Sequence, residues 1–119
     1  MICGTVYWIT GLPGSGKTTL AKLFHRHLQT HSPSALLLDG DALREILGET
    51  ASFQLEDRLR LASIYRRLCK CLSEQGSDVV IATVSMFHAC RAWNRAHLRH
   101  YREIYLRTPL DVLRARQQS

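Results

Sequence analysis

The sequence predicts an α/β fold in which a mostly parallel, twisted sheet of about four strands lies between two layers of helices. Three observations lead to this prediction. Apolar stretches of strand length alternate with stretches of helical periodicity along the whole chain. A glycine-rich segment, residues 11–18, joins the first strand to the first helix. No repeat or linker interrupts the sequence, so we expect a single domain that covers residues 1–119.

The first half of the chain is expected to contain two strands and two helices. The expected elements are a strand at 5–10, a helix from 17 to about 31, a strand at 35–38, a short helix at 42–47 and a loop at 48–54. The first helix repeats apolar side chains on one face until the segment around Pro33 ends it. Gly48 ends the short helix.

The second half continues the alternation of helices and strands. The expected elements are a helix at about 56–75, a strand at 78–84, a helix near 89–100, a strand at 102–107 and a helix from 110 to about 117. Leu61, Tyr65 and Leu72 lie at helical spacing in the long helix, and Gly76 ends it. The continuous apolar run inside 78–84 is typical of a buried parallel strand.

Residues 11–18 read Gly-Leu-Pro-Gly-Ser-Gly-Lys-Thr and fit the phosphate-binding pattern Gly-x4-Gly-Lys-[Ser/Thr]. Glycines let successive backbone N–H groups turn toward one anion, and the following helix presents its unpaired N–H groups to the same anion. Lys17 adds a mobile positive charge, and the Thr18 hydroxyl can bind Mg²⁺. The alternative is an ordinary glycine-rich turn. ATP and Mg²⁺ are the expected cofactors, and the expected ATP-binding residues are Gly11, Leu12, Pro13, Gly14, Ser15, Gly16, Lys17, Thr18 and Thr19.

The charge of the chain favours small anionic nucleotide substrates. The formal net charge is +6, and 13 of the 16 basic residues are arginine, whose forked donors suit phosphate or sulfate oxygens. No nucleic-acid-binding motif and no membrane-spanning stretch is present, so we expect the chain to bind neither nucleic acid nor a membrane. We expect it in the cytoplasm, and a homodimer is possible. The four cysteines lack zinc-site spacing and are expected to be free thiols that mostly fill the core.

Asp39 and Asp41 follow the second expected strand and are separated by Gly40. Ligands of parallel sheets bind at the carboxyl ends of the strands, where Ser85 also follows a strand. Carboxylates beside an ATP site either hold Mg²⁺ or accept a hydroxyl proton. The alternative is that Asp41 caps the helix at 42–47, and the two roles do not exclude each other.

Arg44, Arg58 and Phe53 are further candidates, each with an ordinary alternative. Arg44 lies one turn after Asp41, and Arg58 lies near the start of the long helix. For a single arginine the default is a surface salt bridge. Phe53 lies in a polar loop, where it either covers the core or stacks on a base.

These segments together resemble the adenylyl-sulfate kinase family over nearly the whole chain. The segments that carry the resemblance are 11–18, Asp39-Gly40-Asp41-x2-Arg44, Phe53-x3-Asp57-Arg58, 80–85 and 105–112. The Asp-Gly-Asp-x2-Arg motif is the most specific, because it separates this family from most other P-loop kinases. The resemblance implies the three-layer P-loop NTPase fold and an ATP-dependent kinase that phosphorylates the 3′-hydroxyl of adenylyl sulfate during sulfate assimilation.

The resemblance also implies a role for each matching residue. The implied catalytic residues are Lys17, Asp39, Asp41 and Ser85, and the implied Mg²⁺ ligands are Thr18 and Asp39. The implied acceptor-binding residues are Asp41 beside the hydroxyl, Arg44 and Arg58 on the phosphosulfate, Phe53 on the adenine, and His88. Positioning and charge neutralisation are the main requirements of this chemistry, and these residue types supply both.

Two positions of the acceptor pocket depart from the family pattern. His88 stands where the family usually carries an arginine, and Leu61 stands where it usually carries an asparagine. The loss of a guanidinium and an amide suggests a different or relaxed acceptor. One alternative acceptor is a cytidine diphosphate derivative, used by similar kinases in surface-polysaccharide synthesis, and residues 92–95 also resemble that branch.

A third departure concerns the end of the chain. After residues 113–116 the family continues with Asp-x-Lys-Gly-Leu-Tyr, a lid over ATP, and then a last strand and helix. We therefore expect a form without the lid and with an uncovered sheet edge. This expectation adds a third interpretation, a truncated ATP-binding module with little turnover that acts through a partner.

Overall fold

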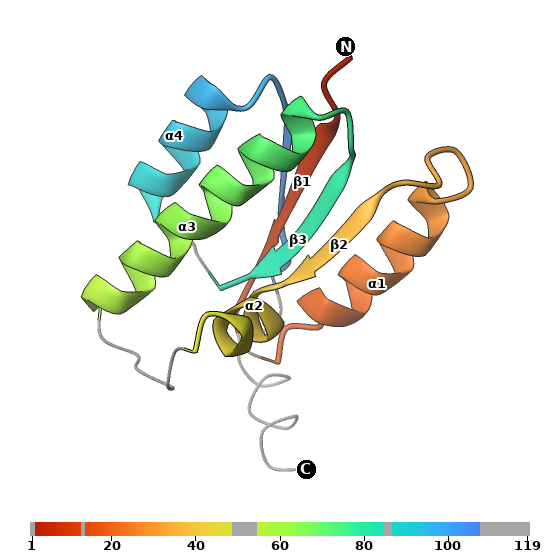
Figure 1. Ribbon diagram of the computed structural model, residues 1–119. Helices are drawn as coiled ribbons and strands as arrows, with labels where there is room; N and C mark the ends of the chain where they lie inside the picture. The colour runs from red at the N-terminus through yellow and green to blue at the C-terminus, as the bar shows by residue number, and fades with distance from the viewer. Residues whose placement is uncertain (1, 13, 49–54, 85–86, 108–119) are drawn as a thin grey trace.

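A computed structural model describes residues 2–12, 14–48, 55–84 and 87–107, and its centre is a four-stranded parallel sheet (Figure 1). The strands are β1 (Thr5–Thr10), β2 (Leu36–Asp39), β3 (Val79–Thr83) and β4 (His100–Tyr105), in the order β2-β3-β1-β4. Every pairing is parallel. The predicted α/β fold with about four parallel strands is therefore confirmed.

Helices cover both faces of the sheet (Figure 1). Because successive side chains of a strand point to opposite faces, β1 presents Val6 and Trp8 to one face and Ile9 to the other. Helix α1 (Lys17–Leu28) covers the face with Ile9, whereas α3 (Leu55–Glu74) and α4 (His88–His97) cover the opposite face. The three-layer arrangement that the resemblance implied is present.

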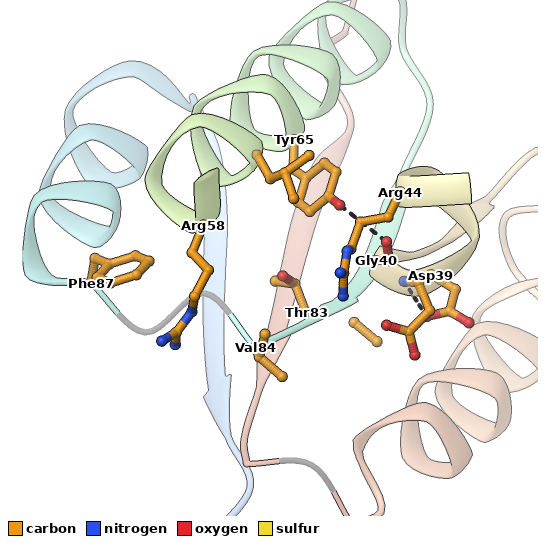
Figure 2. Close-up of a pocket in the computed structure, with 11 residues that line it drawn as sticks. Asp39, Gly40, Arg44, Arg58, Tyr65, Thr83, Val84 and Phe87 are labelled. Carbon is orange, nitrogen blue, oxygen red and sulfur yellow. Dashed lines mark hydrogen bonds between the residues drawn. The ribbon is translucent and has the colours of Figure 1, made fainter. Parts of the chain in front are cut away.

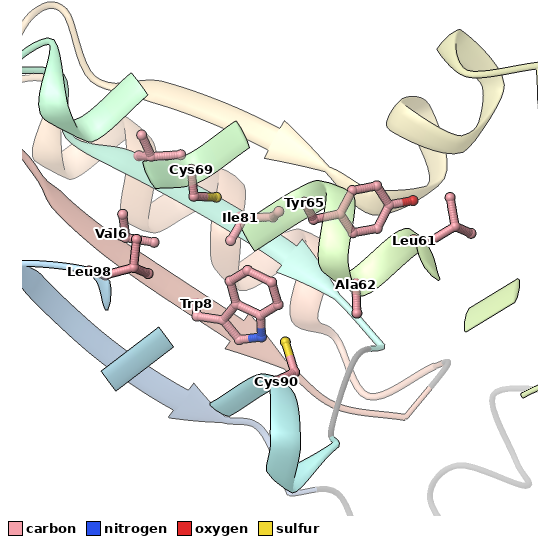
Figure 3. Packing of buried hydrophobic residues seen from close by; sticks show 10 residues of the cluster. Val6, Trp8, Leu61, Ala62, Tyr65, Cys69, Ile81, Cys90 and Leu98 are labelled. Atoms are coloured by element: carbon pink, nitrogen blue, oxygen red, sulfur yellow. The ribbon is translucent and has the colours of Figure 1, made fainter. Parts of the chain in front are cut away.

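The larger of the two cores surrounds Trp8, which is completely buried (Figure 3). Ala62 from α3 and Cys90 from α4 belong to the same buried cluster, as does Ile81 from β3. Burial of such a large aromatic side chain stabilises a fold by about 3–5 kcal/mol relative to alanine. Trp8 therefore holds α3 and α4 against the sheet.

Several predicted boundaries differ from the observed ones. The strand predicted at 102–107 is β4, which begins at His100, because the whole length of β1 pairs with residues from His100 to Tyr105. The helix predicted near 89–100 is α4, which ends at His97 so that this strand can start. The first helix ends at Leu28 rather than near residue 31. The helix predicted from 110 lies outside the described residues.

The short helix α2 (Gly40–Ile46) begins two residues earlier than predicted. Asp39 is its N-cap, and the Asp39 carboxylate accepts a hydrogen bond from the Asp41 backbone N–H at 3.2 Å. The alternative that Asp41 caps this helix is therefore wrong. Capping by Asp39 satisfies one of the backbone donors that the helix start leaves unpaired.

The described helices include none that is long and apolar enough to cross a membrane. All four cysteines are free thiols, as predicted, and Cys69 and Cys90 are buried. Burial, with a smaller contribution from the nearby Cys90, raises the pKa of the Cys69 thiol to about 12. Burial also raises the pKa of Cys90.

The buried thiols make the packing of α3 and α4 measurable. We expect a thiol-alkylating reagent at pH 8 to label the exposed Cys71 at least about a hundredfold faster than Cys69, because the reactive thiolate is nearly absent at Cys69 and access requires unfolding. Mass spectrometry of digested protein, with and without urea, measures both rates. Equal labelling of Cys69 and Cys71 in the native chain would contradict this packing.

Candidate active site

The phosphate-binding segment joins β1 to α1 and has the backbone that an anion site needs. Gly14 and Gly16 have φ angles of 82° and 93°, in the left-handed region that favours glycine. A Cβ atom on Gly11 would lie 2.6 Å from the Ser15 hydroxyl and 2.9 Å from the Leu106 carbonyl oxygen. The Ser15 N–H donates to the Leu12 carbonyl at 3.0 Å and closes the turn. These three glycines are therefore required by geometry.

The amino-terminal end of α1 fits a polyphosphate. Gly16 is its N-cap, no side chain caps the first turn, and that turn holds no acidic residue. Its backbone N–H groups and the positive end of the helix dipole therefore remain available to an anion. A pocket lies over this end, lined by Gly14, Ser15, Gly16, Lys17, Thr18, Thr19, Leu20, Leu23 and Leu106. Most of the predicted ATP-binding residues thus line one pocket.

A second pocket lies at the carboxyl ends of β2 and β3 (Figure 2). It is lined by Asp39, Gly40, Asp41, Arg44, Arg58, Leu61, Tyr65, Ala82, Thr83, Val84 and Phe87. Asp39, Asp41, Arg44 and Arg58 were all predicted site residues, and the fold brings them together from β2, α2 and α3. Such a pocket combines carboxylates, guanidinium groups and an apolar wall.

Strand pairing places the two pockets near each other. Asp39 pairs with Ala82 of β3, and Ala82 pairs with Ile9 of β1. Two strand spacings amount to about 10 Å, so the end of β2 lies about 10 Å from the end of β1, where the phosphate-binding segment starts. The two pockets therefore open at the same edge of the sheet, so that ligands in them would lie close together.

Two contacts hold the Asp39-Gly40-Asp41 segment in place. A Cβ atom on Gly40 would lie 3.1 Å from the Ala82 carbonyl oxygen, so glycine allows the segment to approach β3 closely. In addition, the buried Tyr65 hydroxyl donates to the Gly40 carbonyl oxygen at 3.0 Å (Figure 2). The segment is thus fixed between β3 and α3.

The Arg58 guanidinium lies over the ring of Phe87, 5.4 Å from its centre. Figure 2 shows these two side chains on one side of Thr83 and Val84, and Arg44 and Asp39 on the other. The attraction between a guanidinium and an aromatic face stabilises such a pair by about 0.5–1 kcal/mol at exposed sites. Phe87 therefore restricts the positions that the Arg58 side chain adopts.

The remaining predicted site residues lie elsewhere. His88 is exposed at the first turn of α4 and is absent from the described lining of either pocket; its Nδ1 lies 3.5 Å from the Arg91 guanidinium. Its acceptor-binding role stays a prediction. Pro13, Phe53 and Ser85 lie outside the described residues, and their roles also stay predictions.

Sequence reasoning did not assign Tyr65, Thr83 and Phe87 to the site. Tyr65 was identified only as a member of the apolar face of the long helix. A hydroxyl on an otherwise apolar face was the available signal, because a buried hydroxyl needs a hydrogen-bond partner. Thr83 and Phe87 flank the end of β3, where parallel sheets place their ligands.

The fold and the two pockets define a P-loop nucleotide-binding protein with a second pocket that combines carboxylates and guanidinium groups. Comparison with known proteins narrows this class, because the profile of the adenylylsulphate kinase family matches residues 3–119. The chain belongs to the adenylylsulphate kinase family.

Individual relatives are kinases of more than one kind. The cytidine diphosphoramidate kinase of Campylobacter jejuni is 38% identical over 114 residues, which cover 96% of this chain and 66% of the relative. The adenylyl-sulfate kinase of Paraburkholderia xenovorans is 35% identical over 114 residues, which cover 95% of this chain and 64% of the relative. This chain thus spans about two thirds of the length of either relative.

A solved structure shows the same fold with ligands bound. The APS kinase of Mycobacterium tuberculosis, solved in complex with AMPPNP and APS, superposes with a TM-score of 0.86 at 30% identity. The match covers 98% of this chain and 70% of that structure. The resemblance seen in the sequence motifs is therefore confirmed, whereas the homodimer stays a prediction.

The phosphate pocket can be tested with a single lysine. We expect Lys17→Ala to weaken ATP binding by about 10–100-fold, because a charge-assisted hydrogen bond to phosphate contributes about 1.5–3 kcal/mol. Isothermal titration calorimetry with MgATP measures the dissociation constant. Lys22→Ala is a matched control, since Lys22 is exposed on the same helix and is absent from the pocket lining. Unchanged affinity of Lys17→Ala would remove the phosphate-site assignment.

Proposed function

We propose that the chain is an ATP-dependent kinase that transfers the γ-phosphate of ATP to the 3′-hydroxyl of adenylyl sulfate. The observation that supports this proposal most is the acceptor pocket, in which two carboxylates and two guanidinium groups lie about two strand spacings from the phosphate-binding segment. Guanidinium groups suit an anionic phosphosulfate, and an apolar wall suits a base. Family membership supports the same reaction.

In this proposal each group has a defined task. The Asp41 carboxylate accepts the proton of the acceptor hydroxyl while that oxygen bonds to the γ-phosphorus and the bond from this phosphorus to the bridging oxygen of ADP breaks. Lys17 and the N–H groups of α1 stabilise the charge on the phosphates. Thr18 and Asp39 would hold Mg²⁺, which neutralises phosphate charge when bound. Arg44 and Arg58 orient the acceptor.

A second acceptor class has specific support. The 38% identical relative is a cytidine diphosphoramidate kinase. In this chain Leu61, rather than an amide, lines the acceptor pocket, and it is only 5% exposed. A nucleotide-linked acceptor with a different anionic group is therefore the second candidate, with the same ATP chemistry.

ADP release distinguishes these candidates. The purified chain is incubated with MgATP alone, with adenylyl sulfate, and with cytidine diphosphoramidate, and the products are identified by mass. ADP formed only with adenylyl sulfate, together with a 3′-phosphorylated product, supports the main proposal. Turnover with the cytidine compound alone supports the second candidate. If no ADP forms with either acceptor, both candidate functions are contradicted and the interpretation as an ATP-binding module is supported.

The assigned role of Asp41 leads to a sharper prediction. We expect Asp41→Asn to lower kcat by about 100–10,000-fold, because the amide cannot accept the proton, while the affinity for MgATP changes by less than about threefold. Steady-state kinetics and calorimetry measure the two quantities. Glu45→Gln is the control, since Glu45 is an exposed acid on the same helix that is absent from the pocket lining. Normal turnover by Asp41→Asn would show that the role is wrong.

A further inference from the structure

Tyr65 lines the acceptor pocket, and the proposed mechanism gives it no part in phosphoryl transfer. It is 2% exposed and lies in the middle of α3, where its ring joins the core cluster and also lines the pocket. Its hydroxyl crosses from α3 to the start of α2 and donates to the Gly40 carbonyl oxygen at 3.0 Å. Apolar packing alone would be served by phenylalanine, so the hydroxyl calls for its own explanation.

The partner of this hydroxyl is the backbone between the two carboxylates. Gly40 lies between Asp39 and Asp41, and the Asp41 N–H donates to the Asp39 carboxylate at 3.2 Å. Gly40 also approaches the Ala82 carbonyl so closely that an added Cβ atom would lie 3.1 Å away. The Tyr65 hydroxyl therefore fixes the segment to α3, while Gly40 keeps it close to β3.

The same bond also connects the two halves of the acceptor pocket. Arg58 and Leu61 lie on α3 with Tyr65, about two turns and one turn before it, whereas Asp41 and Arg44 lie on α2. A hydrogen bond from α3 to the first residue of α2 sets the distance between these two groups. Figure 2 shows the bond between Tyr65 and Gly40 beside Arg44, with Arg58 on the other side of Thr83 and Val84.

We propose that Tyr65 is a positioning residue for phosphoryl transfer, whose hydroxyl holds the Asp39 and Asp41 carboxylates in register with the guanidinium group on α3. This proposal rests on the proposed kinase function. Proton acceptance by Asp41 requires placement within hydrogen-bond distance of the acceptor hydroxyl, and small displacements of a reacting group slow catalysis strongly. ATP binds at the end of α1, which this hydrogen bond does not contact.

Tyr65→Phe removes the hydroxyl and keeps the ring. We expect kcat to fall by about tenfold, the acceptor KM to rise, and the KM for ATP to stay within about twofold. Tyr101→Phe is the matched control: the half-buried Tyr101 hydroxyl donates to Glu103 at 3.3 Å and accepts from Asn94 at 3.2 Å, outside both pockets. Thermal unfolding of the two variants measures the stability lost with each hydroxyl.

A second measurement does not depend on activity. Amide hydrogen exchange, followed by NMR, should become about tenfold faster at Asp41 and Ala42 in Tyr65→Phe and remain unchanged there in Tyr101→Phe. Wild-type kcat together with unchanged exchange would overturn the proposal. So would an equal loss of kcat in both variants, since that loss would reflect stability alone. If the unmodified chain transfers phosphate to neither acceptor, the proposed function fails, and hydrogen exchange alone decides whether Tyr65 holds the segment.

Discussion

The position of β3 between β1 and β2 is the constraint on which the rest of the structure depends. All five residues of β3 are buried, and both neighbouring strands pair with it in parallel. Parallel pairing brings the phosphate-binding segment and Asp39 to one edge of the sheet, although 20 or more positions separate them in the sequence. A slip of one residue would turn Val79 and Ile81 away from the Trp8 core, so burial on both faces enforces this register.

Glycines, which have no side chain, determine much of the geometry of the site. At Gly14 and Gly16 the backbone adopts positive φ angles, and the N–H groups at the start of α1 remain uncapped by a side chain. Gly40 has a different role. Its φ angle is not positive, and glycine is needed there because the backbone approaches β3 closely. Local conformation thus requires glycine at positions 14 and 16, whereas close packing requires it at position 40.

This difference explains how much of the site could be predicted from the sequence. Apolar periodicity and the glycine pattern are local signals, so they predicted the strands, the helices and the phosphate pocket. The cap of α2 was predicted two residues too late, at Asp41 instead of Asp39, because the early start depends on contact between Gly40 and β3. The bond from Tyr65 to Gly40 joins residues 25 positions apart, and no sequence pattern specifies it. Likewise, the helix start directs Phe87 into the pocket and leaves His88 exposed.

The lining of the acceptor pocket bears on which acceptors this chain distinguishes. Arg44 and Arg58 are forked donors for an anionic group, whereas Leu61, Val84 and Phe87 form an apolar wall. An apolar wall separates similar ligands by roughly 10–200-fold, while hydrogen bonds to the ligand separate them by about 10⁴-fold or more. Tyr65 also lines this pocket, and its hydroxyl donates to the Gly40 carbonyl oxygen. Recognition by this lining therefore favours an anionic group of the right shape over a particular base, which is why we propose both adenylyl sulfate and a cytidine diphosphate derivative as candidate acceptors.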